Sequence, residues 1–223
     1  IVSVSQTALN EAKIFYRINQ IHTAVIANAA NSNVFLPLTE ISTKPHLVFL
    51  GRANDKVKNI QNILKAADIV YKEIPDLKIS FAPALSGDDF AQSGRGYIVN
   101  SEPVFGEKIA NLLSTSRALL LLSFYEGDPL VVHEAMAMGL PVIASNLPQL
   151  RELLRGYKAA YFANPYDSNE IADVLKKVLD AKLIIQPNPL IRTWDDCAVE
   201  LDKFYKKIFF SSKNGDQRTL KSS

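Results

Sequence analysis

The 223-residue sequence is poor in the features that define several special classes of protein. Its one cysteine, Cys197, cannot form an internal disulfide, which excludes a disulfide scaffold and fits a reducing compartment. The longest apolar run, at residues 118–122, is far shorter than the roughly 20 residues of a membrane helix. The first residues show no basic segment followed by an apolar one, so no secretory signal is visible.

The remaining composition is that of an ordinary globular protein, with 48% apolar and 22% charged residues and a net charge of +2. Basic residues outnumber acidic ones only from Lys203 to the end of the chain. No basic face with interleaved aromatic residues is visible elsewhere, so nucleic acid is not an expected partner. We expect a cytoplasmic protein, and the basic tail leaves open a weak peripheral contact at the inner membrane face.

Short apolar runs alternate with segments of helical periodicity along most of the chain. Residues 47–51 and 118–123 have the continuous apolar pattern of strands buried on both faces, and residues 58–74 have an amphipathic helical pattern. This alternation predicts an α/β fold with a doubly wound, parallel, Rossmann-like sheet. Both ends of the chain lie outside that alternation, since residues 1–42 form short separate elements and the helix at 194–210 stands alone.

The segment with the clearest chemical pattern is SFYEGDPLVVHEAMAMGLPVIAS, at residues 123–145. A buried strand ends at its start and a helix begins near Leu130, so the first-turn amides of that helix can hold a phosphate. Glu134 lies about one turn inside the helix, where its carboxylate can accept two hydrogen bonds from a ribose diol. Glu126 lies in the preceding turn, on the other side of the phosphate position. Together they describe a pocket for a sugar nucleotide.

Two cations, Arg52 and Lys58, follow the first strand of this sheet and enter the same crevice. They would balance a diphosphate and stabilise it as a leaving group, a role in which cations can replace Mg²⁺. A simpler interpretation remains for both: Arg52 pairs with Asp55 at the surface, and Lys58 is an ordinary first-turn residue. Likewise, Glu126 and Glu134 could be solvated residues that make only local caps.

Glu126 and Glu134, with seven residues between them and AMAMGLPVIAS after them, resemble the EX7E signature of retaining glycosyltransferases of family 4. The segment VIANAANSNVF at 25–35 is similar to the interdomain link of that family, and the helix from Trp194 to Tyr205 resembles its closing helix. The resemblance implies a GT-B fold with remnants of the N-terminal domain. The implied organisation is the end of the acceptor domain and the link at 1–42, the donor-binding domain at 43–192, a closing helix at 193–210 and a disordered tail at 211–223.

The resemblance also implies a reaction, the transfer of a hexose from a nucleotide-diphosphate sugar to a glycan or lipid-linked acceptor hydroxyl, with retention of configuration. Glu126 would be the catalytic carboxylate near the anomeric carbon, and Glu134 would hold the ribose. Arg52 and Lys58 would bind the diphosphate. The segment around the helix start would bind the phosphates, and it comprises Gly127, Asp128, Pro129, Leu130 and Val131. Neither a metal nor a cofactor is expected, because the sugar nucleotide is itself the substrate.

Several positions depart from the pattern of the family. Pro129 replaces a common glycine and removes one amide donor. FAPAL at 81–85 stands in place of a glycine loop, which bears on the nucleotide preference. The N-terminal Rossmann domain that would supply the acceptor site is missing, so the chain alone should bind donor and be inactive or weak as a catalyst.

Two alternatives to the transferase stay open on this evidence. One is a sugar-nucleotide epimerase or hydrolase, which would want further carboxylates or a histidine in the crevice. The other is a non-catalytic module derived from the GT-B fold, serving in binding or assembly.

Overall fold

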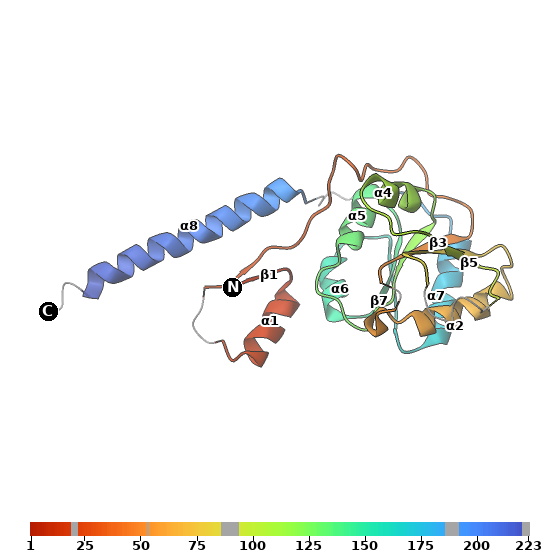
Figure 1. Cartoon of the computed structure of the whole chain (residues 1–223), viewed down its shortest axis with the longest axis horizontal. Helices are drawn as coiled ribbons and strands as arrows, with labels where there is room; N and C mark the ends of the chain where they lie inside the picture. Colours follow the sequence, from red (N-terminus) through yellow and green to blue (C-terminus); the bar gives the residue numbers. More distant parts are fainter. Residues whose placement is uncertain (19–21, 53, 86–93, 186–191, 220–223) are drawn as a thin grey trace.

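A six-stranded parallel sheet forms the body of the protein in the computed structural model (Figure 1). The structure describes residues 1–18, 22–52, 54–85, 94–185 and 192–219. The strand order is β5-β4-β3-β6-β7-β8. These strands are β3 (His46–Leu50), β4 (Lys78–Ala82), β5 (Ile98–Asn100), β6 (Ala118–Leu121), β7 (Val142–Ser145) and β8 (Ala160–Ala163). The predicted doubly wound, Rossmann-like α/β sheet is confirmed.

Helices cover both faces of the sheet, as the continuous apolar strands require (Figure 1). One face is covered by α2 (Ile60–Tyr71) and α7 (Ser168–Asp180). The other face is covered by α4 (Glu107–Ser114), α5 (Leu130–Met138) and α6 (Pro148–Leu153). A single 3-10 turn, η1 (Lys56–Lys58), precedes α2. The predicted helix at 58–74 is therefore the shorter α2, preceded by this turn.

The centre of the sheet lies between β3 and β6, where the order of strands reverses. The chain runs outward from β3 to β4 and β5 on one side, and from β6 to β7 and β8 on the other. Every residue of β6 is buried, in agreement with its run of alanine and leucine. Ligands of open α/β sheets bind beyond the carboxyl ends of the strands at such a reversal.

The helix α5 begins and ends where its flanking residues dictate. Pro129 precedes it with φ −69°, a conformation suited to a helix entrance. Gly139 ends it with φ 76°, in the left-handed region that glycine adopts without steric cost. Because five of its nine residues are buried, α5 is fixed against the sheet with its N-terminus at the carboxyl edge of β6.

The N-terminal segment forms a separate small unit, as predicted from its pattern. Strands β1 (Val2–Ser3) and β2 (Ala24–Val25) pair in parallel, with α1 (Gln6–Phe15) between them. Ser5 caps α1 by accepting a hydrogen bond from the amide of Ala8 at 3.1 Å.

The last helix, α8 (Trp194–Thr219), extends away from the body (Figure 1). It continues beyond residue 210, whereas the sequence predicts a disordered tail from 211. Residues 211–219 are polar and have little apolar surface to bury. They include no proline, however, so they can still satisfy their backbone hydrogen bonds as a helix. Residues 220–223 of the predicted tail lie outside the described residues.

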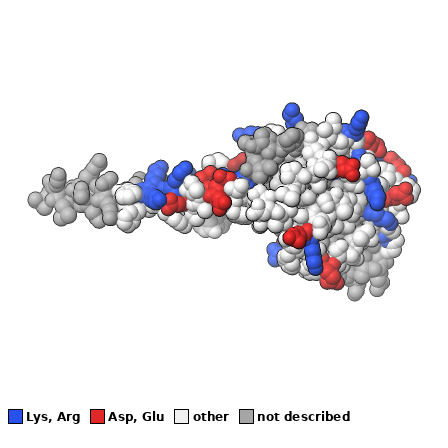
Figure 2. Space-filling view, turned by 90° about the horizontal axis from the view of Figure 1, so that it is seen from above, with Lys and Arg blue, Asp and Glu red and all other residues white. Residues whose placement is uncertain are grey.

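The surface carries both signs of charge. On the face in Figure 2, lysine and arginine side chains are interspersed with aspartate and glutamate. Within the described part of the chain, no helix is long and apolar enough to cross a membrane.

Candidate functional site

Two loops meet at the carboxyl edge of the sheet, one after β3 and one after β6. Lys58 comes from the first loop and Glu126 from the second, and Lys58 Nζ donates to Glu126 Oε1 at 2.7 Å. The hydroxyl of Ser123 donates to the same oxygen at 2.7 Å. Glu126 is 8% exposed, so its charge depends on these two partners. The fold thus brings these two predicted residues into direct contact at the carboxyl edge of the sheet.

Backbone contacts hold the two loops together. The amide of Phe124 donates to the carbonyl of Val57 at 2.8 Å. The side-chain amide of Asn59 donates to the carbonyl of Leu122 at 2.8 Å. These bonds lie on both sides of Lys58 and shortly before Glu126, so the ion pair is fixed by the fold rather than by the two side chains alone.

Glu134 lies on α5, half-buried beside the same edge. Burial raises the pKa of Glu134 to about 7, and the neighbouring His133 opposes this shift. No side chain caps the N-terminus of α5. Its first-turn amides, at Leu130 and Val131, therefore have no side-chain cap, and their predicted role in binding a phosphate stays a prediction.

Asp128 has a different environment from the other residues of the turn. Its carboxylate accepts from the amide of Asn28 at 2.6 Å and lies 2.7 Å from Nε2 of His133. Its carbonyl accepts from the side chain of Asn28 at 2.8 Å. Its side chain is 3% exposed, and both oxygens are engaged. The turn thus binds the segment at 25–35, predicted as a link, and His133 is packed against Asp128.

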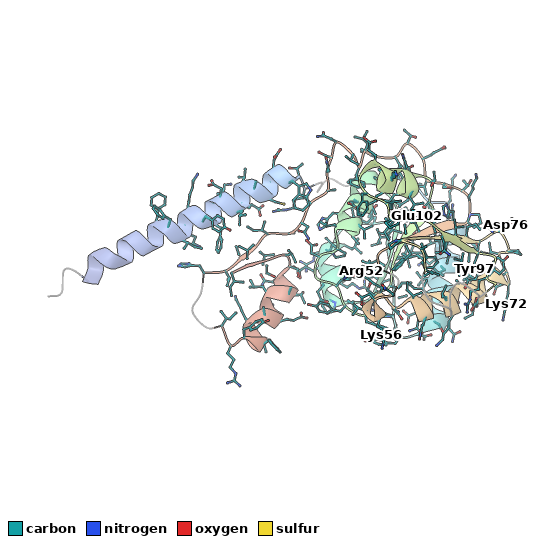
Figure 3. The ribbon with its side chains drawn as sticks, viewed as in Figure 1. Arg52, Lys56, Lys72, Asp76, Tyr97 and Glu102 are labelled. Carbon is teal, nitrogen blue, oxygen red and sulfur yellow. The ribbon has the colours of Figure 1, made fainter. Side chains whose placement is uncertain are left out.

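Arg52 lies at the rim of the crevice. Its side chain is 80% exposed and its guanidinium is 3.7 Å from Asp55, the surface pairing considered above. Figure 3 labels Arg52 and Lys56 on the same connection after β3, with Lys56 at the start of η1. The two predicted cations therefore differ, because Lys58 is paired with the buried Glu126 whereas Arg52 lies in solvent beside Asp55.

The structure also reveals residues that sequence reasoning missed. Ser123 and Asn28 both bond to the predicted turn, from the end of β6 and from the link. The only sequence signal for Asn28 was its place in the link motif, and Ser123 had only its place at the strand end. Gly127 lies beside Val4 of the N-terminal segment, whose side chain would lie 3.8 Å from an added Cβ. Among the described residues, no group of three or more His, Cys, Asp or Glu could hold a metal ion.

A parallel sheet whose strand order reverses between β3 and β6, with helices on both faces, defines a Rossmann-like α/β domain. Residues 44–181 match the family model "Glycosyl transferases group 1", which covers more than half of the chain. The chain belongs to that family, and its fold is of the GT-B type.

Curated relatives agree with this assignment. The chain is 29% identical over 145 residues to a D-inositol 3-phosphate glycosyltransferase of Paenarthrobacter aurescens, covering 60% of this chain and 35% of the relative. It is 24% identical over 188 residues to an MMP alpha-(1->4)-mannosyltransferase of Mycolicibacterium hassiacum, covering 81% of this chain and 45% of the relative. The chain thus spans between a third and a half of the length of these relatives.

Solved structures share the fold at lower sequence identity. A sucrose-phosphate synthase of Thermosynechococcus elongatus superposes with a TM-score of 0.74 at 20% identity, over 94% of this chain and 58% of that one. A TarM variant of S. aureus, solved in complex with UDP among other ligands, has a TM-score of 0.75 at 16% identity, over 91% and 43% of the two chains. These likenesses show the fold.

Proposed function

We propose that this chain is the donor-binding half of a retaining glycosyltransferase of family 4, which transfers a hexose from a nucleotide-diphosphate sugar to an acceptor hydroxyl. The observation that supports it most directly is the contact of Lys58 with Glu126 at the reversal of the sheet, beside the open N-terminus of α5. Glu126 and Glu134 form its EX7E motif. The acceptor, a glycan or lipid-linked hydroxyl, would be bound by another part of the enzyme.

In this proposal each residue has a role that follows from its environment. The diphosphate binds to the first-turn amides of α5 and to the cations Lys58 and Arg52, of which Arg52 turns inward from the rim. Lys58 then leaves Glu126 Oε1 and binds the phosphate. The Glu126 carboxylate can then accept hydrogen bonds from hydroxyls of the hexose, near the anomeric carbon of the sugar. The two cations stabilise the charge that develops on the leaving diphosphate, without a metal.

Glu134 would hold the ribose. Its ionised carboxylate can accept both hydrogen bonds that a diol offers. Burial without a partner raises its pKa to about 7, and two hydroxyl donors would relieve that cost and favour the charged form. In the unliganded protein, burial therefore disfavours the charged form of Glu134, and ribose binding would relieve part of that cost.

Calorimetric titration of this chain with UDP, GDP, ADP and their glucose or mannose conjugates, without metal, tests the proposal. We expect one nucleotide series to bind, Glu134→Ala to weaken every member of that series by about tenfold, and Glu126→Ala to weaken only the sugar conjugates. Glu170→Ala, at a carboxylate on α7 that bonds the amide of Asn164, is the matched control.

Two results would contradict these roles. Equal affinity of wild type and Glu134→Ala for the nucleotide would remove the ribose assignment. Release of free sugar from the conjugate without any acceptor, at the rate of nucleotide formation, would favour the hydrolase instead. Cytoplasmic location and peripheral membrane contact remain proposals for the whole enzyme, to be tested by fractionation.

A further inference from the structure

The helix α8 carries an apolar stripe that its own chain covers only in part. Five apolar residues form it, spaced alternately four and three apart: Trp194, Ala198, Leu201, Tyr205 and Ile208. The helix extends away from the body, and the rings of Trp194 and Tyr205 are 47% and 58% exposed (Figure 1). Ala198 is also exposed, whereas Leu201 and Ile208 are half-buried. This spacing is that of a coiled-coil seam, along which two helices bury their apolar residues against each other.

The contacts that tie α8 to the body lie beside this seam. Cys197 donates to the carbonyl of Ala27 at 3.2 Å, and Glu200 binds Arg192 at 2.8 and 2.7 Å. Cys197 precedes a seam residue and so does Glu200, which places both on the same flank of the seam. The body therefore holds α8 by one flank, and a second helix on the seam does not compete with these contacts.

Charge is divided between the two halves of this helix. Residues 194–202 carry only acidic charges, at Asp195, Asp196, Glu200 and Asp202, and residues 203–210 carry only basic ones, at Lys203, Lys206 and Lys207. Two antiparallel copies place the acidic half of each helix against the basic half of the other, whereas parallel copies place like charges together. An anionic membrane would attract the second half and repel the first. The charge pattern therefore favours a second copy of α8, in antiparallel orientation, as the partner.

The sizes of the seam residues fit the same orientation. With a two-fold axis at Leu201, Tyr205 lies opposite Ala198 of the partner subunit, and Trp194 lies opposite Ile208 of the partner subunit. A large side chain that faces a small one fills the space between two helices without a void or a clash. A parallel pair would instead place two Tyr205 rings together and leave two Ala198 side chains facing each other across a gap.

From these observations we propose that two copies of this chain form a dimer through an antiparallel pair of α8 helices. The seam is buried between them, and Asp195 of each copy lies near Lys206 of the partner subunit, on the flank away from the body. The seam is only about 21 Å long, so the interface is small and the dissociation constant lies in the micromolar range. None of the residues of the donor crevice takes part, so the dimer does not depend on the proposed transferase activity.

The test is sedimentation equilibrium of the whole chain from about 5 to about 500 µM, in about 0.15 M NaCl. We expect the mass to rise from 24.7 kDa toward twice that value as the concentration increases. Tyr205→Asp should weaken the association at least about tenfold, because it would bury a carboxylate in the seam. Phe210→Asp is the matched control, since Phe210 is a 59% exposed ring on the opposite side of α8, and it should associate as wild type.

Charge reversal tests the antiparallel orientation. Lys206→Glu would place a negative charge near Asp195 of the partner subunit, and we expect it to weaken the dimer about fivefold. The double variant Asp195→Lys/Lys206→Glu restores opposite charges and should associate as wild type. Lys203→Glu makes the same change of charge on the side of α8 away from the seam, where salt screens it, and should leave the association unchanged.

Three results would overturn the proposal, with every variant first shown by circular dichroism to keep the helix content of wild type. The first is a mass that stays at that of one chain up to the highest concentration. The second is an equal effect of Tyr205→Asp and Phe210→Asp, which would place the interface elsewhere. The third is a chain that stays monomeric but binds vesicles of phosphatidylglycerol and phosphatidylcholine, with binding lost in Tyr205→Asp, because the seam would then face a membrane.

Discussion

At the scale of single residues, the crevice holds two carboxylates in contrasting environments. Glu126 is buried but paired with Lys58 and Ser123, so its charge is compensated before any ligand arrives. Glu134 is half-buried, and burial raises its pKa to about 7. The first carboxylate is held in place by partners, whereas burial disfavours the charged form of the second. Pairs of titratable groups with such different environments are common at functional sites.

The raised pKa of Glu134 predicts a pH dependence of stability. The folded state holds a proton on Glu134 up to about pH 7, whereas the unfolded chain releases it near pH 4.5. Between these values the folded state binds more protons, so its stability falls as pH rises from about 4.5 to about 7. We expect Glu134→Gln to lack this loss. Urea unfolding of both proteins at several pH values measures their free energies of unfolding. The difference between the two should grow from about pH 4.5 to about pH 7 and stay constant above that.

One result would contradict the raised pKa of Glu134. If the stability difference between wild type and Glu134→Gln stayed constant from pH 4.5 to 8, the carboxyl would titrate normally in the folded state. Burial would then not destabilise the charged form of Glu134. Ribose binding could not relieve such a cost.

At the scale of elements, the turn between β6 and α5 connects the donor crevice to the link at Ala27 and Asn28. Asp128 in that turn accepts two hydrogen bonds from Asn28, and its carboxylate also contacts His133 of α5. A displacement of the link therefore reaches the turn that carries Glu126. Asp128 acts here as a positioning residue, because its carboxylate contacts Asn28 and His133 rather than the sugar.

Replacing Asp128 by asparagine should show this. The asparagine side chain has an NH₂ donor in place of one carboxylate oxygen. That donor would face either the Asn28 amide or His133, and a buried polar group would be left poorly paired. We expect a loss of about 2 kcal/mol in the free energy of unfolding, and faster amide exchange at Asn28. Asp202→Asn, at an exposed pair with Lys206 on α8, should change stability by less than about 0.5 kcal/mol. Unchanged exchange at Asn28 would show that the link does not depend on this carboxylate.

The sequence predicts elements of this fold better than it predicts their contacts. Apolar runs and helical periodicity locate the sheet and its helices, since both report which side of an element is buried. They carry no information on pairing between distant loops. The Lys58–Glu126 bond spans 68 positions and the Asn28–Asp128 bond spans 100. The motif predicts that Lys58 and Glu126 lie near each other, but the bond from Ser123 to Glu126 follows only from the folded geometry.

At the scale of the whole molecule, the link is held from two sides. On one side Asp128 binds Asn28, and on the other the carbonyl of Ala27 accepts from Arg192 at 3.1 Å and from Cys197 at 3.2 Å. Arg192 is itself fixed by a two-fold contact with Glu200 of α8, at 2.8 and 2.7 Å. The N-terminal unit, the sheet and α8 therefore meet at two consecutive residues, which makes this link a point where their orientations are coupled.

A second contact joins the N-terminal unit to the sheet, and it depends on one carboxylate. Glu152 of α6 accepts hydrogen bonds from the amides of Gln6 and Thr7 and from the Thr7 hydroxyl, at 2.7, 3.0 and 2.7 Å. Partial burial opposes its ionisation, but these bonds hold the pKa of Glu152 below its usual value. Its contribution is therefore present above about pH 4.5 and is lost as pH falls through the lowered pKa.

Removing this carboxylate should loosen α1 without loosening the sheet. In Glu152→Ala the first-turn amides of α1 lose their acceptor, at a cost of about 1 kcal/mol, so α1 should exchange its amide protons about fivefold faster at neutral pH. Strands β3 and β6 should exchange as in wild type, and Glu170→Ala should leave α1 unchanged. Hydrogen exchange followed by mass spectrometry measures all three. The wild-type chain should show the same loosening of α1 once Glu152 is protonated in acid, whereas equal α1 protection in wild type and variant at every pH would mean that this carboxylate does not dock the N-terminal unit.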